Sequence, residues 1–97
     1  MFKLKERSRT VRQEIRYDEG MEYIYTLTVR TSDKTASFGL TLYSVAVQLT
    51  DNDGVKSEAS LVDAFRSSSE AFHFFNRIVG NLATPIDLPF VFEDENR

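Results

Sequence analysis

Apolar and charged positions alternate in the segment that follows the first ten residues. Val11, Ile15 and Tyr17 share one parity, and the charged residues at positions 12, 14 and 16 lie between them. Alternation of this kind is the period-two pattern of a β-strand with one buried face. We therefore predict a strand over residues 11–17 in which Val11, Ile15 and Tyr17 point toward the core.

A second strand is predicted directly after a short turn. Residues 17–22, YDEGME, combine acidic turn formers with Gly20, which adopts a positive φ angle at little cost. The run MEYIYTLTVRT, residues 21–31, alternates throughout and is rich in β-branched and aromatic residues. We predict that the two strands form a hairpin.

The longest apolar stretch, FGLTLYSVAVQLT at residues 38–50, changes parity partway along. Its early apolar residues are even-numbered (Phe38, Leu40 and Leu42), and its later ones are odd-numbered (Tyr43, Val45, Val47 and Leu49). One regular strand cannot place both sets on the same face. We predict either a β-bulge or bend near Leu42–Ser44 or two short strands that join there.

The DNDG sequence at residues 51–54 is predicted to be a tight turn before a weaker fourth strand, VKSEASLV, at residues 55–62. A calcium-binding loop fails on spacing. If Gly54 were the invariant loop glycine, the first and last ligand positions would fall on Leu49 and Ser60, which do not supply the required carboxylates. We therefore expect no metal site here.

A helix is predicted from about Ser69 to Leu82. The RSSSE sequence at residues 66–70 offers hydroxyl N-caps, and Pro85 prevents much continuation. At about 100° per residue, one stripe should pack on the sheet, with Phe74 at its edge. The residues of this stripe are Ala71, Phe72, Phe75, Ile78, Val79 and Leu82.

The only histidine, His73, lies almost opposite that stripe, so we predict that its ring faces solvent. General acid–base catalysis needs an oriented group in a cleft, and a nucleophilic serine needs a nearby base. Neither is expected for His73 or for the serines at 67–69, which are better explained as helix caps. We predict no catalytic residue and no enzymatic activity.

The last stretch, TPIDLPFVFEDENR at residues 84–97, fits two alternatives. Phe90 and Phe92 alternate as in a strand. Asp87 could instead cap a short helix with Pro89 in its first turn, where proline is tolerated. We favour the helix.

The composition narrows the class of protein. A chain of 97 residues with average hydrophobic content fits one globular domain, residues 1–97. The absence of cysteine excludes disulfides, thiolate nucleophiles and sulfur-ligated metals. No apolar run is long enough to cross a bilayer, and the start lacks the apolar core of a secretory signal. We expect a cytoplasmic protein without a cofactor.

Charge is unevenly distributed. Residues 1–16 hold six basic and two acidic residues, a net charge of +4, whereas residues 17–97 hold six basic and 13 acidic residues, a net charge of −7. The basic stretch could contact phosphates, although the acidic remainder would repel a polyanion. Residues 1–9 could instead form a flexible arm or a charge-protected edge strand. The candidate phosphate-binding residues are Lys3, Lys5, Arg7, Arg9 and Arg12.

Three stretches together suggest a resemblance. TLYSVAVQL at 41–49, DNDG at 51–54 and NRIVGNLATPIDLPFVFEDE at 76–95 follow one another as a strand, a turn and a helical end. In this order the chain resembles, over about residues 10–95, a family of short bacterial proteins of unknown function. The resemblance implies a small cytoplasmic bacterial α+β protein and transfers no functional residue.

These elements predict an α+β fold: an antiparallel meander of three to four strands, one main helix on one face, and a short C-terminal helix or extended segment. One helix leaves the opposite sheet face exposed, and exposed apolar patches are often interfaces. We therefore expect a non-enzymatic protein-interaction or homodimerisation module. Its candidate contacts are Leu40 and Leu42, or else Tyr43 and Val45. The alternative is nucleic-acid binding through residues 3–16. Neither a metal nor a membrane is expected as a partner.

Overall fold

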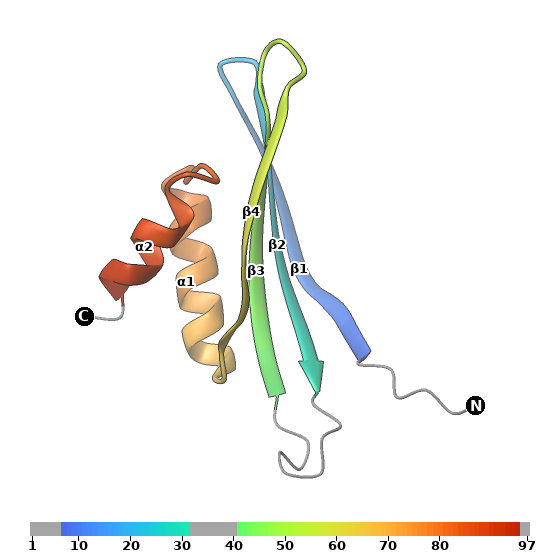
Figure 1. Cartoon of the computed structure of the whole chain (residues 1–97), viewed down its shortest axis with the longest axis vertical. Coiled ribbons are helices and arrows are strands. Elements are labelled where there is room, and N and C mark those ends of the chain that lie inside the picture. The colour runs from blue at the N-terminus through green and yellow to red at the C-terminus, as the bar shows by residue number, and fades with distance from the viewer. Residues whose placement is uncertain (1–6, 32–40, 96–97) are drawn as a thin grey trace.

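The computed structural model describes residues 7–31 and 41–95, and it confirms the predicted α+β fold. Four antiparallel strands form one sheet in the order β1-β2-β3-β4, and two helices follow them in the chain (Figure 1). The elements are β1 (Arg7–Asp18), β2 (Met21–Thr31), β3 (Thr41–Thr50), β4 (Lys56–Phe65), α1 (Ser68–Gly80) and α2 (Leu88–Glu95). Both helices lie on the same side of the sheet (Figure 1).

The β1–β2 turn and the β3–β4 turn meet at one end of the sheet (Figure 1). Glu19 and Gly20 both have positive φ angles, 50° and 82°, as a two-residue type I′ hairpin turn requires. With its amide oriented toward this turn, Asn52 donates hydrogen bonds to the carbonyls of Glu19 (3.1 Å) and Gly20 (3.0 Å). A Cβ atom at position 20 would meet the Asn52 side-chain amide, and the positive φ angle itself favours glycine there.

The DNDG sequence forms the predicted hairpin turn. The Asp51 carboxylate accepts hydrogen bonds from the backbone N–H groups of Asp53 and Val55, each at 2.9 Å. Gly54 has a φ of 82° and donates its N–H to the Asp51 carbonyl at 3.0 Å. The aspartate therefore acts as a local turn residue that bonds its own backbone.

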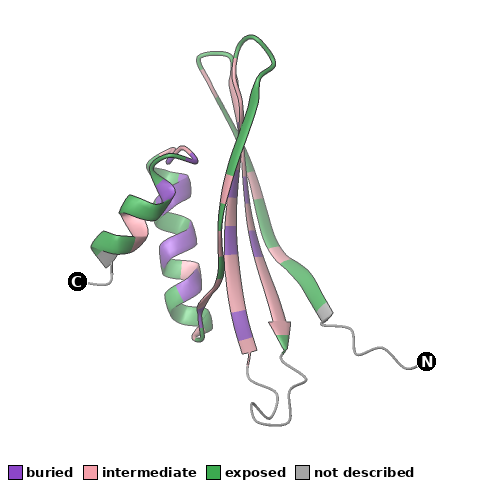
Figure 2. Ribbon diagram, in the orientation of Figure 1, coloured by how far each residue is buried: buried purple, intermediate pink, exposed green. Residues whose placement is uncertain are grey.

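The core lies between the helices and β2, β3 and β4. Tyr25, Leu27, Val45 and Val47 project from the sheet and are fully buried, as are Phe74, Phe75 and Ile78 of α1. Figure 2 shows the buried residues of α1 on its sheet-facing side. The Tyr25 hydroxyl donates to the Ala83 carbonyl at 2.9 Å, and burial raises the pKa of Tyr25. The buried phenol therefore has the partner that its polar oxygen requires.

The prediction for the buried face of β1 is wrong. Ile15 and Tyr17 expose 44% and 73% of their surface, and Ile15 pairs with Ile24 on the sheet face away from the helices. A register shift between Thr10 and Arg12 gives β1 an extra residue, Val11, which packs against the core cluster. The bulge thus separates Val11 from the two residues that share its parity.

β3 keeps a continuous register with β2 from Thr41 to Thr50, so it does not change face over its described length. The predicted irregularity exists, but the extra residues belong to β4. Tyr43 pairs with Phe65 and Val45 pairs with Leu61, which leaves residues 62–64 opposite Ser44 alone. Of the three residues that created the apparent parity change, Leu42 pairs with Arg30 on the face away from the helices, and Phe38 and Leu40 lie outside the described residues.

The expected exposure of Leu42 or Val45 is also wrong. Val45 is fully buried beneath the helices, and Leu42 exposes only 9% of its surface. Tyr43 is half-buried and packs against the core cluster. Leu40 lies outside the described residues. An exposed apolar patch on the sheet must therefore come from other residues.

α1 begins one residue earlier than predicted and ends at Gly80. Ser67 is its N-cap and accepts a hydrogen bond from the Glu70 N–H at 3.3 Å, which confirms the capping role of this serine run. His73 is exposed, as predicted. Phe74 is fully buried rather than at the stripe edge, because it packs against Phe65 and Phe92 with ring centroids 5.2 and 6.0 Å apart.

The C-terminal stretch is helical, as favoured. Its cap differs in detail from the expected one, because Thr84 and Asp87 bond each other reciprocally. The Thr84 N–H donates to Asp87 Oδ2 at 3.0 Å, and the Asp87 N–H donates to Thr84 Oγ1 at 3.2 Å. This is the arrangement of a capping box, with Pro85 just inside it. It aims α2 so that Phe92 reaches the core while Phe90 stays exposed.

Candidate interaction surfaces

Two surfaces of the described structure are not covered by other elements. We call the first the open face: the side of the sheet that points away from α1 and α2. Its centre is polar and contains a shallow depression of about 360 Å³. Hydroxyl groups dominate the lining of that depression, and they belong to Ser8, Thr26, Thr28, Ser44 and Ser60.

An ion pair between Arg30 and Asp63 lies at one side of the depression on the open face. Arg30 of β2 reaches across β3 to Asp63 of β4, with Nε–Oδ1 at 2.8 Å and Nη2–Oδ2 at 2.5 Å. The Asp63 N–H donates to Ser44 Oγ at 2.8 Å, and Asp63 has a φ of 54° in the β4 bulge. Hydrogen bonding from Arg30 lowers the pKa of Asp63. The bulge therefore places the Asp63 carboxylate where the Arg30 guanidinium of the same sheet balances its charge.

Apolar residues flank the polar centre of the open face. Ile15 of β1 lies opposite Ile24 of β2, and Tyr17 of β1 lies opposite Glu22 of β2 on the same face. The Tyr17 hydroxyl donates to Glu22 Oε2 at 3.2 Å, and this hydrogen bond raises the pKa of Tyr17. Val62, on the other side of the face, exposes 70% of its surface.

We call the second surface the arginine groove. The helices pack chiefly on β2, β3 and β4, so the helix side of β1 is left largely uncovered, and β1 is exposed along most of its length (Figure 2). The resulting concavity of about 490 Å³ lies between β1 and α1. Its apolar lining comes from Val11, Val29, Tyr43 and Phe72, with Arg9 beside them.

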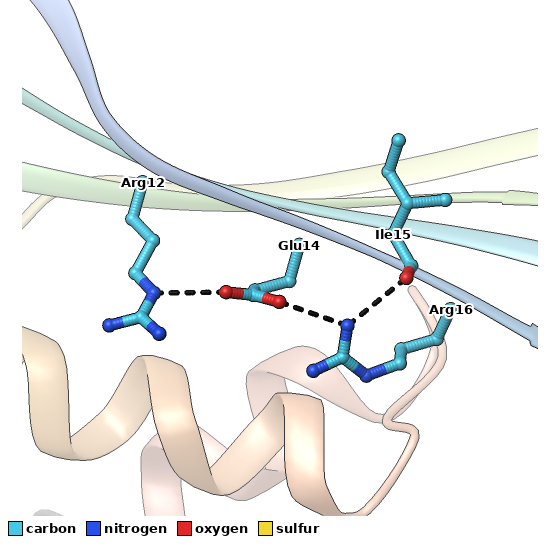
Figure 3. Close-up of polar contacts among 4 residues, drawn as sticks. All are labelled: Arg12, Glu14, Ile15 and Arg16. Carbon is cyan, nitrogen blue, oxygen red and sulfur yellow. Dashed lines mark hydrogen bonds and ion pairs between the residues drawn. The ribbon is translucent and has the colours of Figure 1, made fainter.

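Arginines continue along the same side of β1. Arg12 Nε lies 3.0 Å from Glu14 Oε2, and Arg16 Nη1 lies 2.9 Å from Glu14 Oε1. Figure 3 shows these three side chains on the α1 side of the strand, with the Ile15 side chain on the other side. The hydrogen bond from Arg12, followed by that from Arg16, lowers the pKa of Glu14. Glu14 thus holds two guanidinium groups side by side.

The bulge at Val11 brings Arg9 into line with this cluster. Arg9 pairs with Val29 and Arg12 pairs with Leu27, two residues apart on one face of β2. In a regular strand, positions 9 and 12 would point to opposite faces. The structure therefore assembles Arg9, Arg12 and Arg16 on one side, although the sequence places them at mixed parities.

The structure locates two of the five predicted phosphate contacts, Arg9 and Arg12, on this side of β1. Arg7 begins β1, but its side chain lies outside the described part, as do Lys3 and Lys5. Sequence reasoning missed Arg16 as a member of the cluster. Its shared parity with Arg12 and Glu14 was the available signal.

Within residues 7–31 and 41–95, no group of three or more His, Asp or Glu side chains is placed to hold a metal ion. No helix of the described residues is long and apolar enough to cross a membrane.

A scan against protein-family models, a search of curated proteins and a search of solved structures each returned no match. The suggested resemblance to a bacterial family therefore gains no support from these comparisons.

Proposed function

We propose that the protein is a non-enzymatic interaction module that forms a homodimer through its open face. One observation carries the proposal. The helices cover one face of the sheet only, and the other face presents Ile15, Tyr17 and Val62 as exposed large apolar side chains. Large apolar side chains that stay exposed on a sheet face are a feature of protein interfaces.

The chemistry of the open face suits contact with an identical copy. In a two-fold interface each residue meets the same surface from the partner, so the surface must be complementary to itself. A hydroxyl group both donates and accepts hydrogen bonds, so a face rich in Ser and Thr meets this requirement. The Arg30–Asp63 pair adds no unmatched charge that a second copy would repel.

The size of the face also permits a dimer. Four strands about 4.8 Å apart, each with about ten residues at about 3.3 Å per residue, give a face of roughly 600 Å². Two such faces bury roughly 1,200 Å², which is the lower end of the range for specific interfaces. We therefore expect a dimer that dissociates on dilution, not a permanent one.

Sedimentation equilibrium at micromolar concentrations tests this proposal. The expected mass approaches twice 11.2 kDa as the concentration rises. Ile15→Arg places a charge on the open face and should yield a monomer. Ile86→Arg is the matched control, because Ile86 is 77% exposed and lies between α1 and α2, away from this face. A wild-type mass of 11.2 kDa at every concentration, at low and at high salt, would refute the dimer.

Nucleic-acid binding through residues 3–16 receives less support from the described residues. Arg9, Arg12 and Arg16 share one side of β1, as such binding requires, but Glu14 lies among them and both neighbouring arginines bond it. Affinity for nucleic acid grows with the number of phosphates that a protein neutralises, and Glu14 reduces the three arginines to a net charge of +2. Binding to nucleic acid is therefore retained only as an outcome that the next experiment can reveal.

A further inference from the structure

We propose that the arginine groove is a second docking site, and that it binds an extended acidic segment of a partner protein. In this segment an acidic residue lies two positions from an aromatic or branched aliphatic residue. The site is separate from the open face, because the groove lies on the helix side of the sheet. The inference therefore stands or falls independently of the homodimer.

The charge of the groove calls for a carboxylate. The Arg9 side chain is exposed and makes no ion pair or hydrogen bond with any residue that the structure describes. Arg12 bonds Glu14 through Nε, which leaves its two terminal nitrogens as donors, and its side chain is 48% exposed. Guanidinium groups bind carboxylates through paired, planar hydrogen bonds. Two neighbouring arginines with donors to spare thus form a receptor for acidic side chains.

Glu14 prepares this receptor. By bonding Arg12 at 3.0 Å and Arg16 at 2.9 Å, it restricts two long side chains that would otherwise sample many rotamers. Figure 3 shows both guanidinium groups held on the side of β1 that faces α1. Part of the ordering cost of binding is therefore met before a ligand arrives.

The lining of the groove calls for an apolar side chain beside the carboxylate. Val11, Val29, Tyr43 and Phe72 are all half-buried around a space of about 490 Å³. That volume lies within the range of about 300–1,000 Å³ found for ligand sites. An aromatic or branched aliphatic side chain placed there would remove the exposed parts of these four residues from water.

The position of β1 calls for an extended chain. β1 is an edge strand, so β2 pairs with only one of its two long sides. A peptide that adds to the other side gains main-chain hydrogen bonds, which a nucleic acid cannot supply. Side chains on one face of an extended peptide lie two residues apart. An acidic residue for Arg9 and an apolar residue for the groove therefore lie at positions i and i+2.

Fluorescence anisotropy with a labelled synthetic peptide tests the proposal. The probe is an eight-residue peptide with the pattern Glu-x-Phe-x-Glu, and the control peptide has the same composition with Phe moved by one position. We expect micromolar binding of the probe and weaker binding of the control, by roughly fivefold or more, because the shift turns Phe to the opposite face.

Variants of the protein locate the site. Arg9→Glu should weaken probe binding by roughly tenfold or more, since it replaces an attraction by a repulsion. Arg66→Glu, an exposed arginine outside the groove, should change it by less than about twofold. Circular dichroism should show both variants folded. Ile15→Arg, on the opposite face, should bind the probe like the wild type whether or not it still forms dimers.

Three results would overturn the proposal. The first is no probe binding at millimolar concentration, and the second is equal affinity for the probe and the control peptide. The third is equal affinity of the wild type and Arg9→Glu. A single-stranded oligonucleotide of equal charge is the competing ligand. If it binds more tightly than the probe, and its affinity falls steeply with salt, the groove is a nucleic-acid site instead.

Discussion

The two faces of the sheet belong to the same four strands and yet differ in burial and in polarity. On the helix side, Tyr25, Leu27, Val45 and Val47 are fully buried. On the open face, the same strands present hydroxyl groups and the Gln13 amide, with a few exposed apolar residues at the margins. The helices therefore decide which face becomes core.

In β1 the usual arrangement is reversed, because charged side chains lie on the helix side and an apolar side chain lies on the open face. Its charged residues Arg12, Glu14 and Arg16 face the helix side, whereas Ile15 faces the open side. A strand under the helices could not carry this pattern, because burying charged groups costs far more than exposing one isoleucine. Since the helix layer is centred on the other three strands, β1 is free to place polar side chains beside the core.

The largest expected effect tests the difference between a covered and an uncovered phenylalanine. Phe75 is fully buried against the sheet, whereas Phe90 of α2 exposes 65% of its surface. Phe75→Ala should lower the free energy of unfolding by about 3–5 kcal/mol, because it removes buried contacts and leaves a cavity. Phe90→Ala is the matched control and should stay within about 0.5 kcal/mol of the wild type.

Urea denaturation measures both changes. If Phe75→Ala fails to fold, Phe75→Leu is the milder test. It should unfold at a lower urea concentration than the wild type, and its free energy of unfolding should be lower by about 1 kcal/mol. Similar losses for Phe75→Ala and Phe90→Ala would contradict the division of the molecule into a covered and an uncovered side.

The course of the strands was largely predictable, whereas the exposure of their faces was not. The predicted strand over residues 21–31 coincides with β2, because alternation, β-branched content and flanking turn residues all agree there. Alternation in β1 was also real. Alternation shows only that successive residues point to opposite faces, and it does not show which face another element covers.

The irregularities escaped prediction for a related reason. The bulges at Val11 and at residues 62–64 exist because neighbouring strands are paired on either side of them, and that pairing is not visible in one segment alone. In β4, Asp63 adopts a φ of 54° and is held by Ser44 and Arg30, which are far away in the sequence. Such a position follows from long-range contacts, not from local propensity.

A middle-sized effect tests how much the open face contributes to stability. Asp63→Asn keeps a side chain that tolerates positive φ, but it removes the charge that Arg30 bonds. Both partners of the pair are partly exposed, with 21% and 26% of their side-chain surface accessible. We therefore expect a loss of only about 1 kcal/mol at pH 7. Asp53→Asn, in the exposed β3–β4 turn, controls for the removal of a carboxylate.

The stability that the Asp63–Arg30 pair contributes should depend on pH. The pKa of Asp63 is lowered in the folded protein, so the unfolded chain takes up a proton at higher pH than the folded one. The stability contributed by the ionised carboxylate is present above the ordinary aspartate pKa and is lost as pH falls through the lowered folded value. Asp63→Asn should therefore lose less stability than the wild type between pH 7 and pH 2. Parallel losses in the two proteins would show that the pair does not stabilise the fold.

The candidate site was only partly visible in the sequence. The basic stretch that contains Arg9 and Arg12 stood out by charge alone. The groove beside it did not, because Val29, Tyr43 and Phe72 come from three different elements and meet only in the folded chain. Leu42 and Val45 were expected at an interface for the opposite reason. Their apolar character was clear, but the helices that bury Val45 could not be seen in the strand sequence.

The smallest expected effect concerns the outer side of α1, where the helix meets solvent instead of the sheet. His73 and Phe74 are adjacent in the chain, but on a helix they point about 100° apart. Phe74 is fully buried and His73 is exposed. His73→Ala should change the free energy of unfolding by no more than about 0.5 kcal/mol, as surface substitutions usually do. Phe74→Ala, one position later, should cost about 3–5 kcal/mol.

Thermal and urea unfolding of the two variants measure this contrast. A loss above about 2 kcal/mol for His73→Ala would contradict the exposed position of the imidazole, since substitutions at exposed positions rarely cost that much.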